Sequence, residues 1–119
     1  LEPYLLDVGI ENLTVIPAGK APQNPAELLG SMRMRKLIEQ LKARFDFIII
    51  DAPPIVPVTD VGIFGNLVDG VLMVVQANRT QKGVVRHAES LLKQAQARLL
   101  GYVLTNIRYH IPAYIYRYL

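Results

Sequence analysis

The sequence predicts an α/β domain with a parallel β-sheet and helices on both of its faces. Three observations support this prediction. Apolar runs alternate with amphipathic segments, which is typical of strands joined by helical crossovers. Two runs, residues 47–50 and 71–75, contain no polar residue, as in strands covered on both faces of a parallel sheet. The length of 119 residues fits one domain with one core.

Composition excludes several classes of protein. Hydrophobic residues make up 51% of the chain and charged residues 19%, so the chain is not a disordered, solvated polymer. The absence of cysteine excludes a disulfide scaffold, a thiolate zinc site, an iron–sulfur cluster and a cysteine nucleophile. No apolar run reaches the roughly 18 residues that a membrane-spanning helix needs.

The first half of the chain predicts a strand and a long helix. Residues 13–16 are a short apolar run that ends at Pro17, which is typical of a strand. Asn24 is a good N-cap and Pro25 suits the first position of a helix. We therefore expect a helix over residues 25–44, with one apolar face made of Leu28, Met32, Met34, Leu37, Ile38, Leu41 and Phe45.

The second half continues the alternation. Residues 47–50 and 71–75 predict two strands, and the apolar stretch 61–68 between them predicts a short helix. Thr80 is suited to cap a second long helix, and residues 102–104 predict a last strand. The expected buried stripe of that second helix is Val84, Val85, Ala88, Leu91, Leu92, Ala95 and Leu99.

A carboxylate follows the most apolar strand. Residues 47–50 lead directly into Asp51, and Pro53 and Pro54 follow soon after. In an open α/β sheet, ligands bind outside the carboxyl ends of the strands. P-loop nucleoside triphosphatases use an aspartate in this position to hold the magnesium ion of a nucleotide. A turn-forming aspartate before prolines is the structural alternative.

Three more polar residues lie near expected strand ends. Asp60 is a second carboxylate that could assist metal binding or accept a proton, or it caps the next helix. Asn106 could match an adenine edge, or it is a turn residue. Arg79 could reach a phosphate, or it is a solvated arginine.

Charge is distributed unevenly along the chain. Residues 1–60 carry six basic and eight acidic side chains, a net charge of −2, whereas residues 61–119 carry seven basic and two acidic ones, a net charge of +5. The second half would attract phosphates, an acidic partner or an anionic membrane surface. A solvated basic helix face is the alternative.

Tyrosine is concentrated at the end of the sequence. Four of the six tyrosines lie in residues 109–119, namely Tyr109, Tyr114, Tyr116 and Tyr118. A terminal segment of this kind is accessible to modification, and phosphorylation would place negative charge beside a basic region. An extended edge strand is the alternative, because tyrosine and isoleucine favour strands.

Taken together, these stretches resemble the bacterial tyrosine autokinases (BY-kinases) of polysaccharide export and chain-length control. The resemblance covers nearly the whole chain. It is carried by the tyrosine-rich end and by residues 12–19, 24–29, 45–54, 58–60, 68–70 and 100–106. These kinases are related to chromosome-partition and division-site ATPases, so the resemblance implies a three-layer fold of the P-loop NTPase type.

The resemblance implies roles for individual residues. Asp51 would be the Walker B aspartate that serves magnesium through water. Asn106 would contact the adenine of ATP. The tyrosines of the tail would be phosphorylated by a neighbouring subunit of a ring.

The resemblance also implies partners and a location. These are further copies of the protein, a membrane chain-length (co-polymerase) protein that is fused or separate, and a tyrosine phosphatase; nucleic acid is not expected. The protein would act in the cytoplasm at the inner face of the plasma membrane.

One departure from the family pattern is clear. The sequence contains no Gly-x-x-x-x-Gly-Lys-[Ser/Thr] loop, and the family's second aspartate motif is missing too. The chain therefore resembles the carboxyl-terminal half of a kinase domain (residues 1–108) with its tail (109–119), without the Walker A strand and loop, and we expect it to bind ATP weakly or not at all by itself.

Two other functions stay open on the sequence. One is a partition-type or division-site P-loop ATPase, and the other is a non-catalytic pseudo-ATPase that regulates the membrane protein. A receiver-like signalling module is excluded, because residues 16–19 supply no pair of acids at the end of the first strand.

Overall fold

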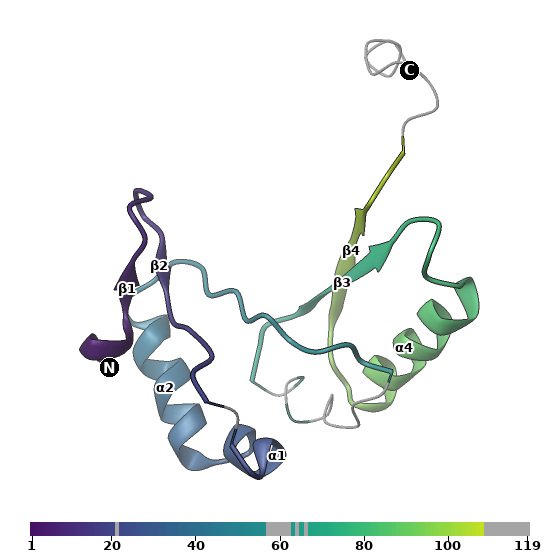
Figure 1. The fold of residues 1–119 in the computed structure, drawn as a ribbon. Helices are drawn as coiled ribbons and strands as arrows, with labels where there is room; N and C mark the ends of the chain where they lie inside the picture. The colour runs from purple at the N-terminus through teal and green to yellow at the C-terminus, as the bar shows by residue number, and fades with distance from the viewer. Residues whose placement is uncertain (21, 57–62, 64, 66, 109–119) are drawn as a thin grey trace.

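The computed structural model describes residues 1–20, 22–56, 63, 65 and 67–108. Figure 1 shows an N-terminal group of elements and a C-terminal group joined by an irregular stretch. In chain order the elements are a 3-10 turn (Glu2–Tyr4), β1 (Leu6–Asp7), β2 (Thr14–Val15), α1 (Pro25–Leu29), α2 (Met32–Lys42), β3 (Val71–Gln76), α4 (Lys82–Gln94) and β4 (Leu99–Thr105).

Strands β3 and β4 form a parallel pair, as the sequence predicts for residues 71–75 and 102–104. The register runs from Val71 opposite Leu99 to Gln76 opposite Thr105, with one irregularity after Val71. Parallel strands need a crossover connection, and α4 supplies it. The predicted βαβ arrangement of the C-terminal half is therefore confirmed.

Helix α4 covers one face of this strand pair and forms the main core with it (Figure 1). Leu92 is the most buried side chain at 1% exposure, and Ala88 lies one turn before it on the same face. Met73 from β3 and Ala97 complete the buried cluster. The predicted apolar stripe is right at its centre but wrong at both ends: Val84, in the first turn of the helix, is exposed, and Leu99 lies in β4 because α4 ends at Gln94.

The predicted strand at residues 13–16 forms, but it joins a different sheet. Its central part, β2, pairs antiparallel with β1, so that Leu6 faces Val15 and Asp7 faces Thr14. The connection is too short for a crossover and gives a hairpin, in which the Asp7 carboxylate accepts a hydrogen bond of 2.8 Å from the Gly9 N–H. The prediction of a fourth parallel strand here is wrong.

The predicted helix 25–44 is two helices separated at Gly30 and Ser31. The Ser31 hydroxyl donates to the Leu28 carbonyl (2.6 Å) and accepts from the Met34 N–H (3.2 Å), so it ends α1 and caps α2. The Asn24 side chain makes no cap bond with the backbone of α1 and donates to Glu27 instead.

The apolar face of these two helices is only partly buried. Ile38 and Leu41 of α2 are buried, whereas Leu28 and Met32 are exposed. The break turns α1 out of line with α2, so a stripe drawn through one continuous helix does not stay on one face (Figure 1).

Residues 47–50 are not part of a hydrogen-bonded strand. A strand needs a neighbouring backbone, and no described strand pairs with this segment. Its alternate side chains Phe47 and Ile49 are 90% and 94% exposed, although the sequence predicts burial on both faces. Half of the predicted short helix at residues 61–68, namely residues 61, 62, 64 and 66, lies outside the described residues.

The contacts that tie distant segments together include two exposed ion pairs. Lys42, at the end of α2, lies 3.3 Å from Asp69, just before β3. Arg44 binds Glu2 at the start of the chain. Exposed pairs of this kind contribute little stability, so the β3–β4–α4 core is the main source of it. None of the helices in the described part of the chain is long and apolar enough to cross a bilayer.

Replacing Leu92 with alanine should destabilise the protein by about 2–4 kcal/mol, because it leaves a cavity between α4 and β3. The matched change Val84→Ala on the same helix should cost less than about 1 kcal/mol, since Val84 is exposed. Chemical unfolding of the full-length gene product checks this. Equal losses for the two variants would contradict the described packing.

Candidate functional site

The carboxyl ends of β3 and β4 lie side by side. Gln76 and Thr105 are the last paired residues, and the Ala77 N–H donates to the Thr105 carbonyl (2.9 Å), which extends the pairing by one residue. Arg79 follows three residues after Gln76, and Asn106 follows directly after Thr105. The structure thus brings two of the predicted site residues to the same edge of the sheet.

A hydrogen-bonded turn leads from β3 to α4. The N–H groups of Arg79 and Thr80 both donate to the Gln76 carbonyl, at 3.3 and 3.0 Å. The Thr80 hydroxyl accepts a hydrogen bond of 3.2 Å from the Gln76 N–H. The prediction that Thr80 caps the helix is wrong: the N-cap of α4 is Gln81, and the Thr80 side chain stabilises the turn instead.

Two asparagines at this edge have left-handed backbone conformations. Asn78, inside the turn, has a φ of 61°, and Asn106 has a φ of 55°. Asparagine tolerates this region better than most residues do, which explains its use at both strand ends. The predicted turn role of Asn106 is therefore present in the structure, and the residue is exposed.

Asp51 lies at the end of the unpaired segment 47–50, and its side chain is exposed. No hydrogen bond or ion pair joins it to Arg79, Asn106 or another described residue. Within the described part of the chain there is also no group of three acidic or histidine side chains that could enclose a metal. Asp51 therefore offers one carboxylate, and a magnesium ion bound chiefly by phosphates and water takes one or two carboxylates from a protein.

The remaining predicted site residues lie outside the described residues. These are Asp60 and the four tyrosines of the segment 109–119, Tyr109, Tyr114, Tyr116 and Tyr118.

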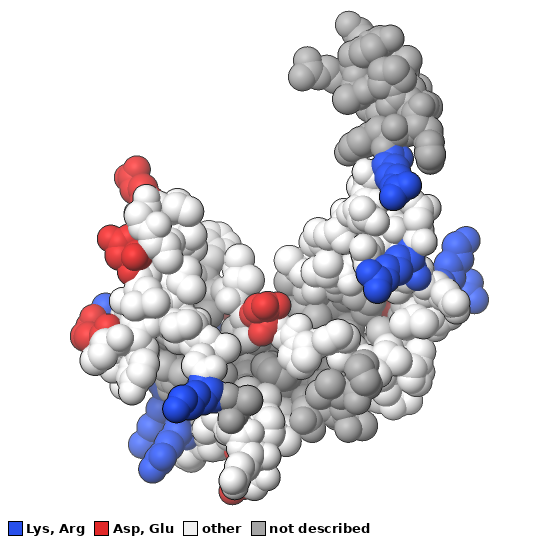
Figure 2. All heavy atoms as spheres, viewed as in Figure 1, with Lys and Arg blue, Asp and Glu red and all other residues white. Residues whose placement is uncertain are grey.

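Surface charge follows the uneven distribution in the sequence. Figure 2 shows acidic side chains along the β1–β2 hairpin and basic side chains below the far end of β4 and around the turn into α4, with a further basic group over α1 and α2. Exposed basic residues near the β3–β4 edge are Arg79, Lys82, Arg86 and Arg108. This surface favours anionic ligands.

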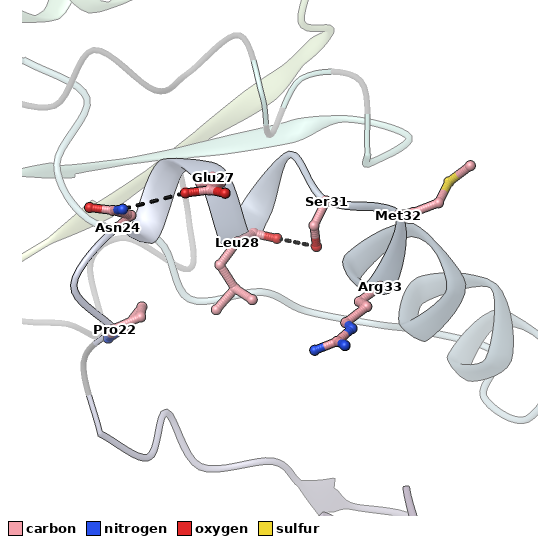
Figure 3. A pocket seen from close by; sticks show the side chains of 7 residues that line it. All are labelled: Pro22, Asn24, Glu27, Leu28, Ser31, Met32 and Arg33. Atoms are coloured by element: carbon pink, nitrogen blue, oxygen red, sulfur yellow. Dashed lines mark hydrogen bonds between the residues drawn. The ribbon is translucent and has the colours of Figure 1, made fainter.

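A shallow hollow lies at the junction of α1 and α2, with a volume of about 500 Å³. Figure 3 shows Leu28 and Pro22 beside it, with Glu27 and Arg33 at its margin; the full lining is Pro22, Asn24, Glu27, Leu28, Ser31, Met32 and Arg33. Sequence reasoning missed this hollow because it assumed one straight helix. The Gly30–Ser31 step was the signal for the break.

Comparison with known proteins identifies the chain's relatives. No protein-family model matches the sequence. The tyrosine-protein kinase CpsD of Streptococcus agalactiae serotype III is 36% identical over 114 residues, which cover 96% of this chain and 49% of that kinase. The tyrosine-protein kinase YwqD of Bacillus subtilis is 37% identical over 96 residues, 81% of this chain and 40% of that kinase. The crystal structure of the VpsO kinase domain matches with a TM-score of 0.84 at 33% identity, over 91% of this chain and 53% of that domain.

Over most of its length, the chain is similar to part of the bacterial tyrosine kinases. The chain spans about half the length of the curated relatives it matches. The shared fold with the VpsO kinase domain confirms the predicted α/β class, and β3, α4 and β4 are its parallel part in this chain.

The left-handed turn predicts a clear difference between two variants of Asn78. Asn78→Gly should leave stability within about 0.5 kcal/mol, whereas Asn78→Ala should cost about 1 kcal/mol more, because alanine resists a positive φ. Thermal unfolding of the full-length gene product measures the difference. An alanine variant as stable as the glycine variant would contradict the turn geometry.

Proposed function

We propose that the chain is part of an ATP-dependent protein-tyrosine autokinase that regulates polysaccharide polymerisation and export. The observation that supports this most is the similarity to proteins named tyrosine-protein kinase over 96% of the chain. The edge formed by β3 and β4 supports it further, because its position is the one at which open α/β sheets bind nucleotides.

In this proposal the β3–β4 edge binds ATP. Asn106 presents an amide with a donor and an acceptor, which can pair with the adenine edge. Arg79 supplies a guanidinium for phosphate oxygens. Asp51 would hold magnesium, through water, and its exposed carboxylate fits that task. Bound magnesium would neutralise charge on the phosphates as the γ-phosphoryl group is transferred.

The hydroxyl that receives the phosphoryl group would come from a tyrosine of the segment 109–119. Tyr109, Tyr114, Tyr116 and Tyr118 are the candidates, presented by a neighbouring copy of the protein. Asp51 or Asp60 would accept the proton of the phenol, in the role of a general base.

The proposal requires a phosphate-binding loop from outside this sequence, since the sequence contains none. The loop would complete the site with backbone N–H groups around the phosphates. Further partners in the proposal are a membrane chain-length protein, fused or separate, and a tyrosine phosphatase. The protein would then work in the cytoplasm at the inner face of the plasma membrane.

Mass spectrometry of the full-length gene product, before and after incubation with magnesium and ATP, tests the function. New phosphate on peptides from residues 109–119 is expected for an autokinase. Hydrolysis of ATP without phosphate on these peptides would indicate the partition-type ATPase. With neither reaction, the protein would be a regulatory pseudo-ATPase.

Asp51→Asn should reduce phosphorylation of the tail by at least about a hundredfold, because the amide removes the charge that holds magnesium. Asp7→Asn is the matched control, since the asparagine oxygen can still accept the hydrogen bond from Gly9. Quantitative mass spectrometry of both variants gives the comparison. Full phosphorylation of the Asp51 variant would remove this residue from the proposed site.

Replacing all four tail tyrosines with phenylalanine should remove the phosphate label while ATP turnover continues. The phenyl ring keeps the shape of each side chain and lacks only the hydroxyl that accepts the phosphoryl group. Radiolabelling and an ATPase assay on the same sample measure both activities. A label that persists at other tyrosines, such as Tyr4 or Tyr102, would show that the tail is not the main acceptor.

A further inference from the structure

The Thr80 side chain has a hydrogen-bonding role that helix capping does not explain. Backbone groups of successive residues in a strand face opposite sides. The Ala77 N–H donates to Thr105 of β4, so the Gln76 N–H faces the side of β3 away from β4. The Thr80 hydroxyl accepts a hydrogen bond from this N–H at 3.2 Å. Thr80 therefore satisfies the last donor on the free edge of β3.

The same residue binds Gln76 a second time. The Thr80 N–H donates to the Gln76 carbonyl at 3.0 Å, so one threonine holds both backbone groups of Gln76. Arg79 lies inside the loop that these two bonds close, and its own N–H donates to the same carbonyl. The closed loop also holds Asn78 in its left-handed conformation, which an open turn would not retain without cost.

We propose that Thr80 is a positioning residue for nucleotide binding: its hydroxyl fixes the 76–80 turn so that Arg79 stands at the same edge as Asn106. This role rests on the proposed function. If the backbone of Arg79 is already fixed, nucleotide binding has to remove less conformational entropy, because only the side chain is still to be ordered. The Thr80 oxygen accepts its hydrogen bond from the Gln76 N–H, so in this inference the residue acts through Arg79.

The test measures the affinity of the full-length gene product for a fluorescent ADP analogue in the presence of magnesium. Thr80→Val keeps the branched shape and removes the hydroxyl, and should weaken binding about fivefold, the ratio equivalent to one hydrogen bond of about 1 kcal/mol. Thr80→Ser keeps the hydroxyl and should bind within about twofold of the unmodified protein. Thr14→Val makes the same chemical change in β2 and should have no effect.

A second background separates positioning from general stability. In a protein that carries Arg79→Ala, adding Thr80→Val should change the affinity by less than about twofold, since the residue that Thr80 positions is already gone. A further loss of affinity in that background would overturn the inference, because it would show an effect independent of Arg79. A serine variant as weak as the valine variant would overturn it too.

The outcomes distinguish this inference from the proposed function. If the unmodified protein does not bind the ADP analogue, the proposed nucleotide site fails and the role of Thr80 fails with it. If the unmodified protein binds and Thr80→Val binds equally well, only the role of Thr80 is refuted. If Thr80→Val unfolds, Thr80→Ala removes the same hydroxyl and takes its place in both backgrounds, with the same expected results.

Discussion

The parallel pairing of β3 with β4 is the interaction on which the rest of the described structure depends. An isolated helix of the length of α4 is marginal in water, and it is stabilised here because Ala88 and Leu92 pack on Met73 of β3. The same pairing fixes the register between Gln76 and Thr105. Arg79 and Asn106 are distant in the sequence, and only this register brings the two strand ends to one edge.

The N-terminal group has no comparable interaction. Its strands are two residues each, and its helices bury only Ile38 and Leu41 fully. The apolar side chains Phe47 and Ile49, and Leu72 and Val74 on the face of β3 opposite α4, are largely exposed. The chain covers 53% of the VpsO kinase domain that it matches, so about half of that fold has no counterpart here. The exposed apolar surface agrees with a fold of which this chain supplies only a part.

The sequence predicted the elements whose determinants are local and missed those that depend on neighbours. The apolar run 71–75 predicts the strand β3, and the four-residue spacing of Ala88 and Leu92 predicts the buried face of α4. Both predictions are confirmed. One missed feature is nevertheless local. The Ser31 hydroxyl bonds to Leu28 and Met34, three residues away on either side, and the apolar periodicity does not show the helix break that the Gly30–Ser31 step signals. Residues 47–50 have the composition of a strand, but pairing requires a second backbone, and composition cannot supply it.

The candidate site also has one part that the chain forms by itself and one part that needs a further strand. The turn that carries Arg79 is closed by bonds within residues 76–80, and Asn106 is placed by the β4 pairing, so this half of the proposed nucleotide site is built by the chain itself. Asp51 follows an unpaired segment, so its direction depends on the strand that would pair with residues 47–50. In the proposed kinase, binding of the adenine base and binding of the magnesium ion would therefore depend on different parts of the fold. The first depends on the β3–β4 pair, and the second requires that residues 47–50 be completed as a strand.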